Sequence, residues 1–133
     1  MINARRLAGA AAACGKVFVV GGYSDVACRT LEATCEMFDP LVSQGSLVSS
    51  PIVPRAASAM VSFDDHLYLF GGENASWSKH DSVERYDVQN DKWELFGTMP
   101  EKLACVLPVF KLQCCYCQRN IYLHREINCH THF

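Results

Sequence analysis

The clearest pattern along the chain is an alternation of side chains over residues 56–63. One face carries Ala57, Ala59, Val61 and Phe63, and the other carries Ala56, Ser58, Met60 and Ser62. A period of two is typical of a β-strand, and the small side chains indicate crowded faces. The next apolar run, residues 67–70, is continuous, as in strands that are covered on both faces. Asp64-Asp65, between the two segments, predicts a tight turn.

Two further strands are predicted after this pair. Residues 82–87 and 92–96 carry the apolar and aromatic side chains typical of strands, and Gln89-Asn90-Asp91 predicts the turn between them. The polar residues 73–81 are expected to form the loop that leads into the third strand. This part of the chain therefore predicts a unit of four short strands.

The same unit occurs earlier in the chain. Gly21-Gly22 recurs as Gly71-Gly72, 50 residues later, and in both places the pair ends an apolar run. Residues 35–40 match residues 83–88, with two extra residues in the loop of the first copy. We expect glycine at the end of the strand because the backbone angles, or a close approach of another segment, exclude a Cβ there. The sequence therefore contains two copies of one repeat.

These repeats resemble the kelch repeat, the four-stranded blade of a β-propeller. The family's marks are a double glycine after the second strand, a Glu and an aromatic-Asp pair on the third strand, and a tryptophan further on. The second copy carries them as Gly71, Gly72, Glu84, Tyr86, Asp87 and Trp93. The first copy carries Gly21, Gly22, Glu36, Phe38 and Asp39. Gly45 stands in place of its tryptophan, so its outer strand is uncertain.

The resemblance implies an all-β fold, an incomplete kelch β-propeller. We expect a degenerate repeat at residues 5–54, a well-matched repeat at 55–101, the start of a third at 102–112, and an irregular Cys/His-rich tail at 113–133. Propellers of this kind close with about four to eight blades, so two blades and a fraction do not form a ring. One hypothesis is therefore a truncated isoform or fragment without independent function.

The resemblance also implies a function in protein binding. Many kelch-like proteins are substrate receptors of cullin-RING ubiquitin ligases, and some bind actin. The receptor role requires a BTB domain as well, and this sequence contains none. We therefore expect a non-enzymatic module whose partner is a protein, for example a ubiquitination substrate or actin. Exposed blade faces and open strand edges also favour self-association.

Candidate binding residues lie mainly in the loops between second and third strands. They are Tyr23, Asp25 and Arg29 in the first repeat, and Asn74, Trp77, Lys79 and His80 in the second. Trp77 is the leading candidate because an aromatic side chain in a polar loop is a typical binding hot spot, although it could instead pack over the adjoining blade. Arg55 precedes an inner strand and either lines a face or ties neighbouring blades together. The repeat explains Glu84, Tyr86 and Trp93 as structural.

Composition and charge limit which classes of protein and of partner remain possible. The chain has 133 residues, of which 50% are hydrophobic and 20% charged, a balance typical of a globular domain. A net charge of -2 gives no reason to expect nucleic acid or an anionic membrane as partner. No apolar run reaches the roughly 18 residues of a membrane-spanning helix. Eight cysteines without a convincing secretory signal indicate reduced thiols in the cytosol or nucleus, and we expect a cytoplasmic location.

The tail offers one alternative chemistry. Its cysteines and histidines have the spacing of a four-ligand zinc site, formed by Cys114, Cys117, Cys129 and His132, with Cys115, His124 and His130 as spare ligands. The tail has no glycine to form the tight turns of a zinc knuckle, so chance composition is the favoured interpretation. We therefore expect no cofactor, and the alternative is a small zinc-stabilised protein.

Overall fold

A computed structural model describes residues 1–104, which form eight strands in two antiparallel four-stranded sheets. The strands are β1 (Gly9–Ala13), β2 (Lys16–Val20), β3 (Cys35–Asp39), β4 (Gln44–Val48), β5 (Ala59–Phe63), β6 (His66–Phe70), β7 (Ser82–Asp87) and β8 (Lys92–Thr98). These residues form no helix, and hence none that could cross a membrane. The prediction of an all-β fold is confirmed.

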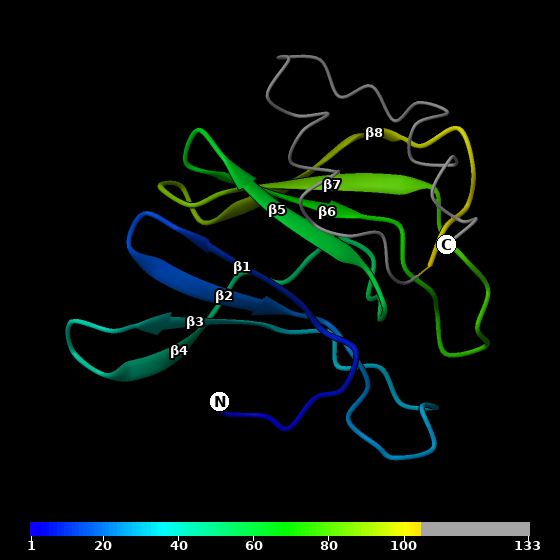
Figure 1. Cartoon of the computed structure of the whole chain (residues 1–133), viewed down its shortest axis with the longest axis horizontal. Helices are drawn as coiled ribbons and strands as arrows, with labels where there is room; N and C mark the ends of the chain where they lie inside the picture. Colours follow the sequence, from blue (N-terminus) through cyan, green and yellow to red (C-terminus); the bar gives the residue numbers. More distant parts are fainter. Residues whose placement is uncertain (105–133) are drawn as a thin grey trace, which may run out of the picture.

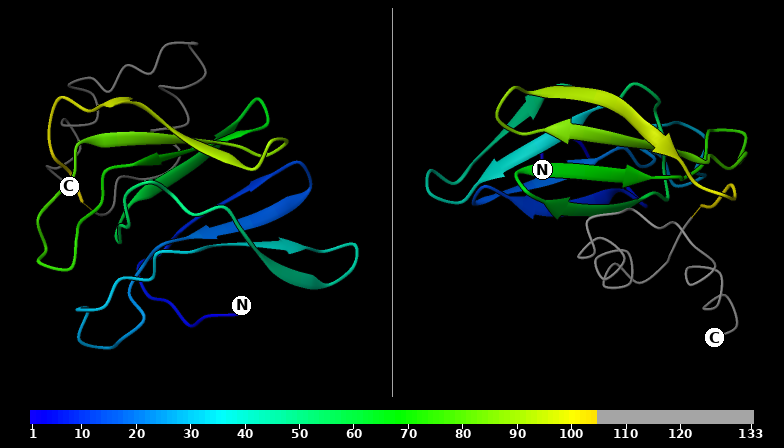
Figure 2. Two further views of the ribbon diagram at one scale, coloured as in Figure 1. Left: turned by 180° about the vertical axis from the view of Figure 1, so that it is seen from behind. Right: turned by 90° about the horizontal axis from the view of Figure 1, so that it is seen from above.

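Each sheet is a simple meander. The first sheet has the order β1-β2-β3-β4 and the second the order β5-β6-β7-β8. The two sheets lie face to face, with the inner strands β1 and β5 in contact (Figures 1 and 2). The predicted tight turn is present, because Asp64 and Asp65 have φ angles of 48° and 59°.

The strand boundaries differ in part from those that the pattern predicts. β5 begins at Ala59, and Ala56 forms an isolated bridge with Glu73 instead of extending the strand. β8 continues past residue 96 to Thr98, where a bulge between Val83 and Glu84 shifts the register of its partner β7. β4 forms and pairs with β3 although Gly45 replaces the tryptophan, so the outer strand of the first repeat is present.

The double glycines join one repeat to the start of the next. Gly21 and Gly71 have φ angles of 64° and 59°, and a Cβ on either would collide with a backbone carbonyl, that of Arg55 or of Leu103. The amide of Gly22 donates to the Arg55 carbonyl at 3.0 Å, and that of Gly72 donates to the Leu103 carbonyl at 2.8 Å. The expectation that close approach excludes a Cβ here is confirmed. Leu103 thus holds the position in this linkage that Arg55 holds one repeat earlier.

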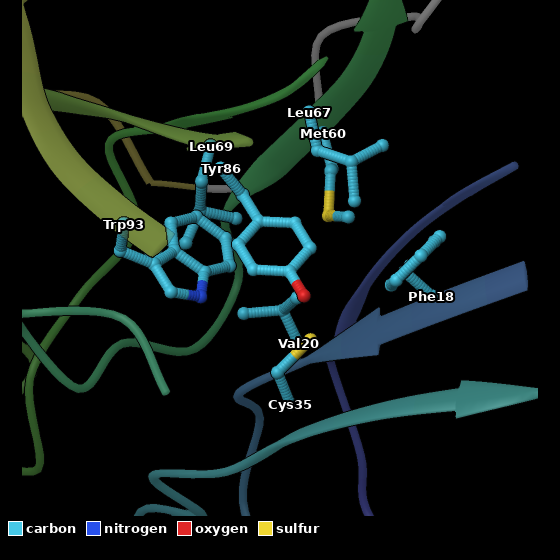
Figure 3. Close-up of a cluster of buried hydrophobic side chains, with 8 residues drawn as sticks. All are labelled: Phe18, Val20, Cys35, Met60, Leu67, Leu69, Tyr86 and Trp93. Carbon is cyan, nitrogen blue, oxygen red and sulfur yellow. The ribbon is translucent and has the colours of Figure 1, made fainter. Parts of the chain in front are cut away.

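Side chains from both sheets form the main hydrophobic core. The first sheet contributes Phe18, Val20 and Cys35, and the second contributes Met60, Leu67, Leu69, Tyr86 and Trp93 (Figure 3). The Tyr86 ring packs edge-on to Phe18 at a centroid distance of 5.7 Å and lies 4.9 Å from Trp93. The indole N–H of Trp93 donates to the Ser49 carbonyl at 2.8 Å, so the tryptophan also fixes the segment that connects the sheets.

A buried arginine–glutamate pair occurs in each repeat. Nη2 of Arg55 lies 2.6 Å from Oε2 of Glu84, and both side chains are fully buried. Glu84 also accepts hydrogen bonds from the backbone amides of Ile52 and Val53, at 2.6 and 3.2 Å. This carboxylate therefore binds the connecting segment as well as Arg55, so the pair holds the start of the second repeat against its own third strand.

The first repeat builds the same arrangement from its own residues. Arg5 pairs with Glu36 at 2.6 Å, and Glu36 also accepts hydrogen bonds from the amides of Ile2 and Asn3. The N-terminal residues are thereby fixed to β3 in the way that residues 52 and 53 are fixed to β7. The remainder of the expected third repeat beyond Ala104, and the tail with its candidate zinc ligands, lie outside the described residues.

Candidate protein-binding surface

The loops that follow β2 and β6 project side by side at the same end of the two sheets (Figures 1 and 2). We call residues 23–32 and 73–81 the loop face. The Tyr23 hydroxyl joins the two loops, because it lies 3.0 Å from Oε1 of Glu73 and 3.1 Å from the Asn74 carbonyl oxygen. Tyr23 is fully buried, and burial followed by the hydrogen bond to Glu73 raises its pKa to about 12. The two loops therefore form one continuous surface.

Each loop contains a turn organised by an acidic or amide side chain. In the first loop, Oδ1 of Asp25 accepts hydrogen bonds from the amides of Arg29 and Thr30, both at 2.9 Å. The hydrogen bond from Thr30 is the main cause of the lowered pKa of Asp25. In the second loop, Oδ1 of Asn74 accepts from the amides of Ser76 and Ser78, at 2.9 and 3.0 Å. These are side-chain-to-backbone turns in which Asp and Asn are favoured.

The two turns place equivalent residues in the left-handed backbone region. Cys28 has a φ angle of 55°, and Trp77 has a φ angle of 62°. Both lie three residues after the organising side chain, and each donates its amide to the backbone carbonyl of that residue. The turn geometry therefore belongs to the repeat, while the side chain that it presents differs between the loops.

Trp77 lies at the junction of the two loops. Its indole N–H donates to the Cys28 carbonyl at 3.1 Å, and 57% of the residue remains exposed. Trp77 thus touches the adjoining repeat through one polar contact and leaves most of its ring open. Such a partly anchored, exposed aromatic side chain has little conformational entropy left to lose on binding a partner.

Two of the candidate binding residues do not lie on the surface. Tyr23 and Arg55 are both fully buried and satisfy groups inside the protein, so the expectation that they contact a partner is wrong. Tyr23 connects the two repeats, whereas the Arg55 guanidinium binds Gly71, Ser82 and Glu84 of its own repeat. A hydroxyl or guanidinium that is buried in this way is inaccessible to a partner.

The other candidates have varied exposure. Arg29, Trp77 and Lys79 are exposed, whereas Asp25 and Asn74 are half-buried by their own turns. His80 is also half-buried, its buried Nε2 atom has no hydrogen-bond partner among residues 1–104, and burial lowers its pKa.

The structure adds Val26 to the loop face. Val26 is 85% exposed, and its carbonyl accepts a hydrogen bond from Nη1 of Arg6 at 2.9 Å. The criterion that identified Trp77, an aromatic residue in a polar loop, does not include Val26 because hot spots are enriched in aromatic residues. A broader criterion, any large apolar residue in a polar loop, would include it.

The repeat marks lie in the strands and their ends. Glu36, Glu84, Tyr86 and Trp93 are buried, whereas Phe38 is 43% exposed. The carboxylates of Asp39 and Asp87 accept amides of the turns that follow their strands, at 3.0 Å from Leu41 and from Gln89. Residues 1–104 contain no group of three or more side chains arranged to hold a metal ion.

The sheet order and the linkage through double glycines define consecutive blades of a propeller-type all-β protein. A family model described as the kelch motif matches residues 4–44 and 54–100. The chain therefore belongs to the kelch repeat family, whose members are generally non-enzymatic protein-interaction modules.

Known proteins with similar sequences carry the same repeat in their names. An F-box/kelch-repeat protein of Arabidopsis thaliana is 35% identical over 98 residues, which cover 71% of this chain and 20% of that protein. Kelch repeat and BTB domain-containing protein 13 of Homo sapiens is 34% identical over 101 residues, covering 75% of this chain and 21% of that protein. Beta-scruin of Limulus polyphemus is 28% identical over 107 residues, covering 77% and 12%. The chain thus spans about a fifth or less of these relatives.

Proposed function

We propose that this chain is a non-enzymatic protein-binding module whose binding surface is the loop face, with Trp77 at its centre. The observation that carries this proposal is the exposed indole held across two repeats by its hydrogen bond to the Cys28 carbonyl. Because the two turns fix the backbone on both sides, a partner meets a preformed surface and little ordering is needed on binding. Val26 provides a second exposed apolar side chain on the same surface.

The test compares Trp77→Ala with a matched surface variant. Leu41 is 92% exposed in the turn between β3 and β4, at the opposite end of the first sheet. Wild type, Trp77→Ala and Leu41→Ala would each be immobilised, and proteins captured from a cytosolic extract would be quantified by mass spectrometry. We expect the proteins that wild type and Leu41→Ala retain to bind Trp77→Ala about thirtyfold more weakly. This is the loss expected for a hot spot of about 2 kcal/mol. Equal capture by all three proteins would contradict the proposal.

We further propose that the chain recognises substrates for a cullin-RING ubiquitin ligase in the cytoplasm. Actin is the second candidate partner. The F-box and BTB names of two relatives, together with the kelch resemblance, support the ligase assignment. The name of Beta-scruin gives no partner, so actin rests on the resemblance alone. Within residues 1–104, Cys14, Cys28 and Cys35 form no disulfide with one another, which is consistent with a reducing compartment. Co-sedimentation with filamentous actin distinguishes the two candidate partners. Recovery of the wild-type chain in the actin pellet, and its loss in Trp77→Ala, would favour actin.

Self-association is a second candidate, favoured by the apolar outer face of the first sheet. Val17, Phe38 and Leu47 on this face are 40%, 43% and 52% exposed. Light scattering over a range of protein concentrations would detect association, and Phe38→Ser should return the protein to a monomer. A concentration-independent monomeric mass for the wild type would exclude it.

A further inference from the structure

The two sheets of residues 1–104 have four edge strands, and three of these are protected from pairing with a further strand. β1 and β5 lie against each other where the sheets meet. β8 carries the charged residues Lys92 and Glu94, of which Glu94 pairs with Arg85. A bulge between Val83 and Glu84 also interrupts the register of β8 with β7. Cover, charge and bulges are the usual means by which proteins prevent pairing at a sheet edge.

Within residues 1–104, β4 has none of these protections. Its sequence, Gln44-Gly45-Ser46-Leu47-Val48, contains no charged side chain, and four of the five residues are exposed. In the described part of the chain, its register with β3 is continuous and β3 is the only strand beside it (Figure 1). The free edge of such a strand presents backbone N–H and C=O groups that a further strand can bind.

The first sheet has an open position beside this edge. In the second sheet, Trp93 lies beside Tyr86 in the neighbouring strand. In the first sheet the same position is Gly45, beside Phe38. Among the described residues, a Cβ added at Gly45 would come within 4 Å of the Met37 carbonyl oxygen alone, and Phe38 is 43% exposed. The outer face of the first sheet therefore lacks one apolar side chain next to its edge.

The β4 strand of a second copy can supply this side chain. In an antiparallel pair of β4 strands centred on Ser46, all five residues are paired, and Leu47 of each copy lies opposite Gly45 of the other. We propose that two copies of this chain associate through their β4 edges about a two-fold axis, with Leu47 of each copy packing over Gly45 of the other and towards Phe38. This inference rests on the self-association proposed above, specifies its surface, and is independent of the loop face.

The strand is complementary to itself, which favours a second copy over an unrelated strand. Gly45 and Leu47 lie on the same face, because alternate residues of a strand do, so each copy contributes one open position and one side chain to fill it. The first sheets of the two copies would then form one continuous sheet. A single pair of short strands buries little area, so we expect the association to be weak and reversible.

Sedimentation velocity of the full chain up to about 500 µM tests the inference, because a small interface forms only at high concentration. We expect a monomer–dimer equilibrium for the wild type. Leu47→Lys should raise the dissociation constant of the dimer by at least about tenfold, because a lysine on an edge strand disfavours pairing. Leu95→Lys on β8 is the matched control and should leave the constant unchanged. Leu95 is 63% exposed, and each of the two leucines pairs with the buried glutamate of its own repeat.

Cysteine substitution tests the register of the pair. Under mild oxidation, Ser46→Cys should form a disulfide between the two copies, because the two residues at position 46 lie opposite each other. Gln44→Cys should not link to itself, because it lies opposite Val48 of the other copy. Mass spectrometry of the linked peptides distinguishes these disulfides from any that the native cysteines form. Circular dichroism checks that each variant keeps its β-sheet spectrum.

The outcomes separate this inference from the functions proposed above. A wild type that stays monomeric would overturn both the edge pairing and the self-association, and would leave the loop face intact. A dimer that Phe38→Ser dissociates but Leu47→Lys leaves unchanged would overturn the edge pairing alone. Linkage through Gln44→Cys instead of Ser46→Cys would also overturn it. Trp77→Ala, which tests the loop face, should leave the dimer unchanged.

Discussion

The two sheets have the same topology and the same buried Arg–Glu pair, but their corresponding faces differ in exposure. On the second sheet, Tyr86 is 1% and Trp93 7% exposed, because the first sheet covers them. On the first sheet, the equivalent positions are Phe38, 43% exposed, and Gly45. The aromatic mark of the repeat is thus buried in one copy and open in the other.

This difference shows that the neighbour, rather than the motif, determines what a repeat mark contributes. Tyr86 packs against Phe18 and Trp93, whereas Phe38 has no sheet among residues 1–104 to pack against. Repeat proteins gain much of their stability at the interfaces between units. The second sheet therefore gains more stability from Tyr86 and Trp93 than the first sheet gains from Phe38.

The largest expected effect comes from Arg55→Ala. The substitution leaves the carboxylate of Glu84 buried without its cation, which should lower the free energy of unfolding by about 3–5 kcal/mol. Urea denaturation followed by circular dichroism measures the change. Glu94→Ala is the matched control, because its pair with Arg85 is partly exposed and should contribute about 0–1 kcal/mol. Similar losses for both variants would contradict the importance of the buried pair.

The second largest effect is the difference in stability cost between the aromatic repeat marks Trp93 and Phe38. Trp93→Ala removes a core side chain and should cost about 3 kcal/mol, whereas Phe38→Ala should change stability by at most about 0.5 kcal/mol. Both variants can be compared by their urea midpoints. If Phe38→Ala were as damaging as Trp93→Ala, the outer face of the first sheet would be covered in solution, as self-association requires.

Substitution of Tyr23 tests the contact between the two loops. Tyr23→Phe removes the hydroxyl shared with Glu73 and Asn74 and should cost about 1 kcal/mol. Between pH 10 and about 12 the unfolded state loses the phenolic proton while the folded state keeps it, so the wild type loses stability as the pH rises. Burial raises the pKa of Tyr86 as well, so this loss has two sources. Tyr23→Phe should show a smaller decline than wild type in thermal melts across this range, and an identical decline would contradict the assigned pKa.

The smallest effect is expected from Asn74→Ala. The substitution removes the two hydrogen bonds that the amides of Ser76 and Ser78 donate to the Asn74 side chain, which should loosen the second loop and lower the free energy of unfolding by less than about 1 kcal/mol. Amide hydrogen exchange at Ser76 and Ser78 should accelerate. Asn74→Asp should retain slow exchange, because Asp25 already forms the equivalent turn in the first loop. Unchanged exchange in Asn74→Ala would show that the side chain does not hold the turn.

The fold could be predicted from local pattern because strands and turns depend on nearby residues. The alternation around Val61, the apolar run of β6 and the double glycines identify a repeated four-stranded unit. The sequence predicts β4 only weakly because the tryptophan is absent there, yet backbone pairing with β3 is sufficient to form it. The side-chain pattern ends β8 at residue 96, because it does not encode the register shift between Val83 and Glu84.

The candidate surface was predicted less completely. Trp77 could be identified as an aromatic residue in a polar loop, but the hydrogen bond to Cys28 joins residues 49 positions apart. The sequence wrongly predicts Tyr23 and Arg55 as surface residues, because their partners in the fold determine whether a polar side chain is accessible. Sequence identifies such residues as unusual, and only the packing of the two sheets shows which way they point.

The most direct test of this account uses the two tryptophans of the chain as probes. Trp77→Phe leaves Trp93 as the only tryptophan, and Trp93→Phe leaves Trp77. With excitation at a wavelength that the five tyrosines do not absorb, acrylamide quenching reports on each tryptophan separately. If the sheets pack as described and the loop face is open, Trp93 should emit at shorter wavelength and be quenched weakly, while Trp77 should be quenched strongly. Equal, strong quenching of both would contradict the packing of the two sheets on which the loop face depends.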